Sequence, residues 1–286
     1  MTLPNFLIIG APRSGTTSLY HYLKEHPQIF MSKQKELRFF AFVGETLNFK
    51  GPYDDQFVNQ ESITTLEQYQ DQFKEATTQI ARGESSPIYL WWPNVPERIH
   101  QCLPDVKLIT IFRNPVERAY SDFLNMRNLG WEPLRDFQEA LEKEQDRINQ
   151  EWGPFYYYQK KGFYATYLKD YLQFFDSDQI HICFYEDLCR DPQSLLKNIF
   201  QFLGVDDGFQ CNTSKIFNSA KDAKISTKNN LQNFIKTLFK TTHSSITDPI
   251  NPNIQKKLID IYQEDILNLQ ELTHRDLSHW LEIKNE

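Results

Sequence analysis

Short apolar runs alternate with longer amphipathic stretches along this chain, and this alternation constrains the fold more than any other feature. Continuous apolar runs bounded by glycine, proline or polar residues predict buried strands at 5–10, 106–112 and 179–185, and a further short strand is expected at 79–84. Helical spacing of apolar residues predicts helices at 16–25, 62–75, 94–102, 163–175, 192–203 and 252–270, and a charged, solvated helix at 134–150. Strands and helices in alternation predict a three-layer α/β fold of the P-loop type, in which helices flank a central parallel β-sheet.

The composition narrows the class of protein. With 286 residues, no internal repeat and no clear linker, we expect one domain over 1–286. The 38 acidic and 31 basic residues give a net charge of −7, which argues against nucleic acid as the main partner. No apolar run is long enough to span a membrane, and MTLPN at the start leaves no room for a signal peptide. Four cysteines without a CxxC spacing fit a reduced cytoplasm.

One stretch departs from the acidic balance. Residues 215–240 hold six lysines against a single acid, Asp222, which gives a local charge of +5. Such a stretch is either a solvated face or a local clamp for an anion. The region 208–230 is expected to be a loop.

A phosphate-binding turn is predicted between the first strand and the first helix. Gly10 and Gly15 have the G-x4-G spacing of a Walker A loop, but Thr16 stands where that motif has its lysine. The cation of this loop is Arg13. Backbone N–H groups and the positive end of the helix dipole favour an anion here, whereas the missing lysine argues against handling of a triphosphate. An ordinary strand-to-helix turn is the alternative.

A second basic motif, Phe-Arg-Asn-Pro-Val-Glu-Arg-Ala-Tyr-Ser, spans 112–121 and follows the strand 106–112. Arg113 comes at the carboxyl end of this strand, where α/β sheets bind ligands. Ser121 lies in the following helix and shares a face with Arg118, while Tyr120, Phe123 and Leu124 are expected to face the core. Because both motifs lie on the same edge of the sheet, they predict a ligand with two separated anionic groups.

From Phe6 to Trp280, these motifs resemble the sulfotransferase superfamily that uses 3′-phosphoadenosine 5′-phosphosulfate (PAPS), and within it the branch of heparan sulfate N- and O-sulfotransferases and their bacterial relatives. The resemblance implies a 3′-phosphate site at Arg113 and Ser121. A late basic loop, 217–228, is similar to a third family element with Lys221 and Lys224 as its cations, and Gly162 and Tyr164 resemble an element beside the site. The 5′-phosphosulfate would be cradled by Arg13, Ser14, Gly15, Thr16, Thr17 and Ser18.

The same resemblance implies a catalytic base, Glu36, in KELRFF. Its neighbours Lys35 and Arg38 favour the ionised carboxylate, and a surface carboxylate paired with these two bases is the alternative. Relatives often have a lysine where this chain has Ser85, so Arg13, with Lys33 or Lys35, is expected to balance the charge on the leaving group. His21, in the first helix, and His26, after it, are expected to pack or cap. No metal site is expected, because His181 has no further ligands nearby.

The resemblance thus implies in-line transfer of a sulfuryl group from PAPS to a hydroxyl or amine acceptor without a metal. Two alternatives stay open, a P-loop kinase or NTPase and a catalytically inactive nucleotide-binding protein. The acceptor is expected to be a carbohydrate or a small metabolite, while the sequence predicts neither its identity nor the oligomeric state. Aromatic clusters at 91–92 and 155–158 either line an acceptor cleft or belong to the core, which we expect for at least half of them.

Overall fold

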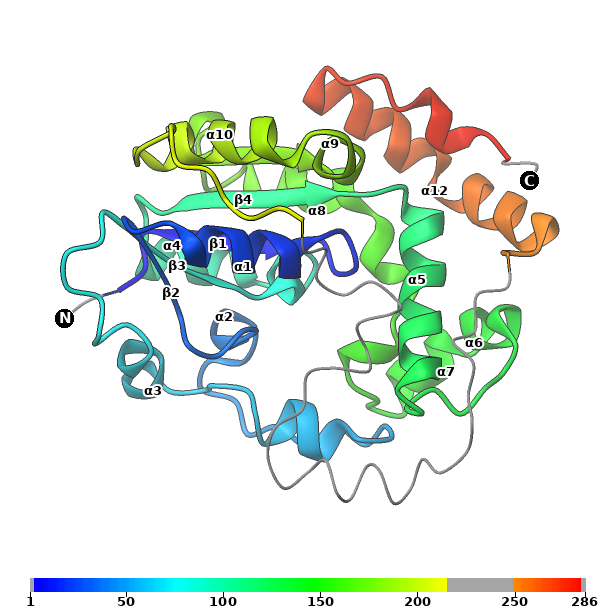
Figure 1. Ribbon diagram of the computed structural model, residues 1–286. Coiled ribbons are helices and arrows are strands. Elements are labelled where there is room, and N and C mark those ends of the chain that lie inside the picture. The colour runs from blue at the N-terminus through cyan, green and yellow to red at the C-terminus, as the bar shows by residue number, and fades with distance from the viewer. Residues whose placement is uncertain (1–2, 215–248, 284–286) are drawn as a thin grey trace.

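The computed structural model describes residues 3–214 and 249–283 (Figure 1). Its centre is a five-stranded sheet in which every neighbouring pair of strands is parallel, in the order β2-β3-β1-β4-β5. The strands are β1 (Phe6–Gly10), β2 (Ile29–Met31), β3 (Ala81–Ser85), β4 (Lys107–Phe112) and β5 (Ile180–Phe184). The predicted α/β fold with a central parallel sheet is confirmed.

Helices cover both faces of this sheet and form the outer layers (Figure 1). Along β1, Phe6 and Ile8 point to one face, and Leu7 and Ile9 point to the other. The first face packs against α1 (Thr16–Glu25), α9 (Tyr185–Arg190) and α10 (Pro192–Leu203). The second face packs against α4 (Val95–Cys102), α5 (Pro115–Asn128), α8 (Tyr164–Tyr171) and α12 (Pro252–Thr273).

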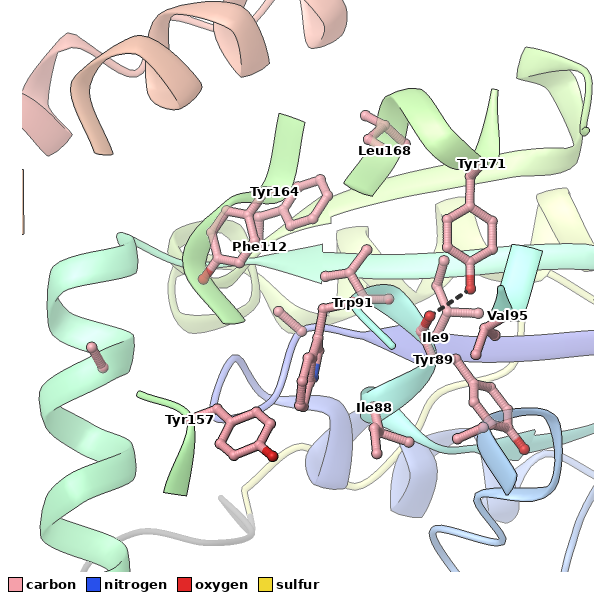
Figure 2. Packing of buried hydrophobic residues seen from close by; sticks show 14 of the residues in the cluster. Ile9, Ile88, Tyr89, Trp91, Val95, Phe112, Tyr157, Tyr164, Leu168 and Tyr171 are labelled. Atoms are coloured by element: carbon pink, nitrogen blue, oxygen red, sulfur yellow. Dashed lines mark hydrogen bonds between the residues drawn. The ribbon is translucent and has the colours of Figure 1, made fainter. Parts of the chain in front are cut away.

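Aromatic side chains fill much of the second face (Figure 2). The Tyr171 hydroxyl donates a hydrogen bond of 2.9 Å to the Tyr89 carbonyl oxygen, and the rings of Phe112 and Tyr164 stack with their centres 4.8 Å apart. Of the two aromatic clusters singled out above, most members are buried, as expected: Trp91, Tyr156, Tyr157 and Tyr158. Trp92 and Phe155 stay partly exposed.

The structure differs from the sequence-based prediction in several places, among them the unpredicted short helices α2 (Phe39–Phe42) and α9 and the shorter α8. The strand β2 was not predicted, because three residues are too few to show a periodic pattern. The helix predicted at 62–75 is shorter, α3 (Leu66–Asp71). The charged stretch 134–150 forms two short helices, α6 (Phe137–Glu142) and α7 (Glu144–Asn149), and it is not wholly solvated. Arg147 is buried there and holds the Glu132 carboxylate with two bonds of 2.7 and 2.8 Å.

The remaining short helix, α2 (Phe39–Phe42), follows the segment that carries Glu36. Within residues 3–214 and 249–283, no helix combines the length and the apolar character that crossing a membrane requires.

Candidate active site

The turn between β1 and α1 depends on a glycine with a left-handed backbone. Gly15 has a φ of 99°, in the left-handed region, and a Cβ at this position would lie 2.6 Å from Leu188 Cδ2. No acidic residue lies in the first turn of α1, so the positive end of the helix dipole is not neutralised there. Ser14 and Thr16 are buried in the turn. The predicted phosphate-binding turn therefore has the local structure that such a site requires.

The turn after β1 and the motif after β4 meet in space, because these two strands are neighbours in the sheet. Arg113 Nη1 donates to the Arg13 carbonyl oxygen at 3.3 Å. The Arg13 side chain reaches across in return, with Nη2 lying 3.5 Å from Ser121 Oγ. Asn114 caps α5 by accepting from the Val116 N–H at 2.9 Å, which fixes where Arg113 leaves the strand. The two motifs that are predicted to bind anions thus contact each other.

Positive charge is concentrated at this junction. Burial lowers the pKa of Arg13; the Asp122 carboxylate opposes this shift, and the guanidinium of Arg113 adds to it. Arg13 Nε is buried without a hydrogen-bond partner among the described residues. A half-buried guanidinium with a buried, unused Nε donor, near a second arginine, is an arrangement that an anionic ligand would complete.

Two residues that sequence reasoning missed hold the Arg113 side chain. Glu117 forms an ion pair with it at 3.3 Å, and the ring of Tyr185 lies 4.7 Å from its guanidinium carbon. Both could have been found from the sequence: Glu117 follows Arg113 by four residues on a helix, and Tyr185 is the last residue of a predicted strand, at the same edge of the sheet. Together they orient the guanidinium toward the turn at 10–17.

Arg118, which was expected to share a helix face with Ser121, points into the core. Arg118 is fully buried, donates to the Tyr158 carbonyl oxygen and lies 3.4 Å from Asp122. Lys161, also buried, forms an ion pair of 2.7 Å with the same carboxylate. The helix directs Arg118 into the core because a buried carboxylate and a buried carbonyl oxygen are available there to satisfy it.

Glu36 lies in a strained segment at the same edge of the sheet. Glu36 and Arg38 have φ values of 64° and 57°, which residues other than glycine seldom adopt. The segment is held by β3 and the residue after it, because the Glu36 N–H donates to the Ser85 carbonyl oxygen at 2.9 Å and the Arg38 N–H donates to Ser86 Oγ at 3.0 Å. Strain of this kind concentrates at functional sites.

Two cations flank the Glu36 carboxylate, as expected both for a catalytic base and for a surface carboxylate paired with its neighbours. Lys35 Nζ lies 2.6 Å from Oε1, and Arg38 Nη2 lies 3.5 Å from Oε2. Burial alone would raise the pKa of Glu36, but these two charges outweigh it and lower the pKa to about 2. The side chain stays 35% exposed, so the ionised carboxylate is accessible to another molecule. Lys33 turns away and pairs with Glu75 on the surface.

A second carboxyl group, that of Glu84, is buried beneath this segment. It accepts from Ser86 Oγ at 2.7 Å and from the Tyr69 hydroxyl at 3.4 Å. Burial raises the pKa of Glu84 to about 7. The adjacent Ser85, which replaces the lysine of the family pattern, has a buried Oγ without a hydrogen-bond partner in the described part of the chain.

The other predicted residues are placed as follows. Thr17 and Ser18 lie in the first turn of α1, whereas Lys221 and Lys224 lie outside the described residues. His26 was expected to pack or to cap: it is the C-cap residue of α1, its ring packs against Phe200, and its Nε2 lies 2.9 Å from the Asp206 carbonyl oxygen. In the described ranges, no three His, Cys, Asp or Glu side chains gather in a way that would hold a metal ion.

The fold is that of a P-loop-type α/β protein, and two arginines, Arg13 and Arg113, lie together where β1 and β4 end. The profile of the protein family described as Sulfotransferase domain matches residues 3–270. The chain belongs to this sulfotransferase family. The crystal structure of a sulfotransferase from Alicyclobacillus acidocaldarius has 31% identical residues and a TM-score of 0.82, covering 99% of this chain and 100% of that one.

Two further relatives are larger proteins. The membrane-associated sulfotransferase kil1 of Dictyostelium discoideum is 24% identical over 96% of this chain and 66% of that protein. A bifunctional heparan sulfate N-deacetylase/N-sulfotransferase of Drosophila melanogaster is 26% identical over 71% of this chain. The match spans only 20% of the Drosophila protein.

Proposed function

We propose that this protein transfers a sulfuryl group from PAPS to a hydroxyl or amine group of an acceptor. One observation supports the proposal: two distant motifs contact each other where two parallel strands end, because the Arg113 guanidinium donates to the Arg13 carbonyl oxygen and the Arg13 guanidinium lies 3.5 Å from Ser121 Oγ. The donor has anionic groups at both ends of its ribose, and the two arginines supply one partner for each. The turn at 13–18 binds the 5′-phosphosulfate, and Arg113 with Ser121 binds the 3′-phosphate.

The residues present also suit the chemistry. Sulfuryl transfer, like phosphoryl transfer, depends on in-line positioning and on stabilising charge at the leaving oxygen. In our proposal, Arg13 and the N–H groups of the turn stabilise that charge. Lys33 pairs with Glu75. Arg13 therefore stabilises the charge on the leaving oxygen without a contribution from Lys33. Glu36 acts as the general base that takes the proton of the acceptor.

Nucleotide binding tests the donor site. By calorimetry in the presence of EDTA, 3′,5′-ADP should bind more tightly than ATP, and added Mg²⁺ should not reverse this order. Arg113→Ala should weaken 3′,5′-ADP binding at least tenfold, because it removes a charge-assisted pair. Lys74→Ala, which removes an exposed cation, should leave the affinity unchanged. Preference for ATP with Mg²⁺ would instead indicate a kinase or NTPase.

The base is tested separately. Glu36→Gln should retain 3′,5′-ADP binding while transfer from labelled PAPS falls by about 100-fold or more, the usual contribution of a general base. Glu61→Gln, an equivalent change on the exposed surface, is the matched control. An unchanged rate in Glu36→Gln would show that another group takes the proton.

Several narrower points stay predictions. They are the choice between a small-molecule and a glycan acceptor, the roles of Lys221 and Lys224, the absence of nucleic acid among the partners, and a cytoplasmic location.

A further inference from the structure

The segment that carries Glu36 is connected to the buried carboxyl group of Glu84 through a hydroxyl group. Ser86 Oγ accepts from the Arg38 N–H at 3.0 Å and donates to Glu84 Oε2 at 2.7 Å. Glu84 itself is fully buried in β3. Its carboxyl group therefore reaches the backbone of the Glu36 segment through a single side chain.

Two tyrosines extend this arrangement to the next two residues of the segment. The Tyr89 hydroxyl accepts from the Phe40 N–H at 3.4 Å and is also a hydrogen-bond partner of the Glu84 carboxyl group. The Tyr69 hydroxyl donates to Glu84 Oε1 at 3.4 Å. The Tyr69 ring stacks on Phe39, with the ring centres 4.3 Å apart and the planes within 14° of parallel. Three consecutive residues of the segment are thus each contacted by a side chain that this carboxyl group holds.

The segment needs such support because its backbone is strained. The φ values of Glu36 and Arg38, 64° and 57°, persist only where the surrounding structure over-determines them. The Glu36 N–H also donates to the Ser85 carbonyl oxygen at 2.9 Å, so the same stretch of chain fixes this residue directly. Holding the Arg38 backbone further sets where its Nη2 meets the Glu36 carboxylate, 3.5 Å away. The direction of the Glu36 side chain therefore depends on contacts made by β3 and the residues after it.

A carboxyl group at this buried position lowers stability at neutral pH. Burial raises the pKa of Glu84 to about 7 against the opposing effect of its three hydroxyl partners, and the Glu36 carboxylate adds to the rise. An apolar side chain of similar size would avoid the cost of burying a charge. A group that lowers stability and lies this close to a reactive carboxylate is typical of a functional site.

We infer that Glu84 is a positioning residue: through the three hydroxyl groups, it holds the strained segment so that the Glu36 carboxylate faces the acceptor. This inference rests on the proposed function for the role of Glu36 as the base. Being fully buried, Glu84 does not reach the donor or the acceptor itself. Its replacement should therefore lower the rate of transfer at saturating donor and leave donor binding unchanged.

Hydrogen exchange measured by mass spectrometry tests the positioning without any catalytic reaction. In Glu84→Met, which keeps the volume and removes the acceptor oxygens, amide exchange in peptides covering 36–42 should be about tenfold faster or more. Glu84→Gln keeps the shape and an acceptor oxygen for Ser86, so its exchange should stay within about threefold of the wild type. Tyr262→Phe, which removes a buried hydroxyl that donates to the Gln159 carbonyl oxygen at 2.8 Å, is the control that should not change these peptides.

The release of labelled sulfate from PAPS, with water as the probe acceptor, tests the consequence for the reaction. Glu84→Met should lower kcat about tenfold or more, while the KM for PAPS stays within about twofold, and Glu84→Gln should retain most of kcat. In the Glu36→Gln background the positioned group is already gone. There, Glu84→Met should lower the residual rate by less than about twofold. A general loss of structure would lower the rate equally in both backgrounds.

Ser86→Ala is the second variant, in case Glu84→Met does not fold, because it removes only the link between the carboxyl group and the Arg38 N–H. It should also speed exchange in the same peptides and lower kcat. Unchanged exchange in the folded variants, faster exchange with unchanged kcat, or an equal loss of rate in the Glu36→Gln background would each overturn the inference. Failure of the proposed function is distinct: the wild type would then not bind 3′,5′-ADP, or Glu36→Gln would keep the wild-type rate, and the exchange result depends on neither.

Discussion

The buried carboxyl group of Glu84 should make the free energy of unfolding decrease as the pH rises. Its pKa is about 7 in the folded protein, against 4.5 for an ordinary glutamate. The folded protein therefore holds this proton more tightly than the unfolded chain does. The resulting stability is fully present below pH 4.5 and is lost as the pH rises through about 7. At 1.36 kcal/mol for each pKa unit, the loss is about 3 kcal/mol.

The variant Glu84→Gln tests this reasoning, because a neutral amide of the same shape removes the titration. Relative to the wild type, the variant should gain about 3 kcal/mol of stability between pH 4.5 and pH 8. This corresponds to roughly 6 °C in Tm for a chain of this size. Urea unfolding at several pH values measures it, with Glu61→Gln as the exposed control. A constant difference between variant and wild type across this pH range would refute the reasoning.

Three further predictions concern the proposed donor and base residues. Arg113→Lys should weaken 3′,5′-ADP binding about tenfold in calorimetry, because lysine lacks the planar fork of donors; equal affinity would exclude a bidentate contact. Lys35→Met should raise the pKa of Glu36 from about 2, so the acid limb of kcat/KM should move to higher pH, and an unmoved limb would contradict the base assignment. Gly15→Ala should cost about 1–3 kcal/mol in urea unfolding. In a Leu188→Ala background, Gly15→Ala should cost less than in the wild type but should still be destabilising, since the φ of 99° remains. No cost in that background would show that the left-handed backbone contributes nothing.

Much of the fold could be predicted because its strands are buried on both faces and so appear as continuous apolar runs. The strands β1, β4 and β5 were found for this reason, and the Asn114-Pro115 start of α5 followed from capping chemistry. The burial of Arg147 could not be predicted. Its partner Glu132 is fifteen residues away, and only the tertiary structure brings the two charges together.

The site was predictable where its residues directly follow strands. The carboxyl ends of parallel strands share one edge, so the turn after β1 and Arg113 after β4 had to lie near each other. The packing of Tyr53 and Phe57 against Trp131 and Phe155 was not predicted, because these rings come from three segments, two of which are joined by the buried Asp54 contacts. A buried aspartate between two glycine N–H groups leaves no periodic pattern in a sequence.

The residues at the strand ends and those in the connecting segments can be changed separately, which matters for engineering. The two arginines and the glycine turn are anchored to β1 and β4, whereas Glu36, Tyr53 and Phe57 belong to the stretch joining β2 to β3, and Trp131 and Phe155 belong to the stretch between α5 and α8. If the proposed function holds, grafting both stretches together from another member of the family should change the acceptor and leave the nucleotide-binding residues unchanged. Transplanting either stretch alone would break the Asp54 bridge that registers one against the other.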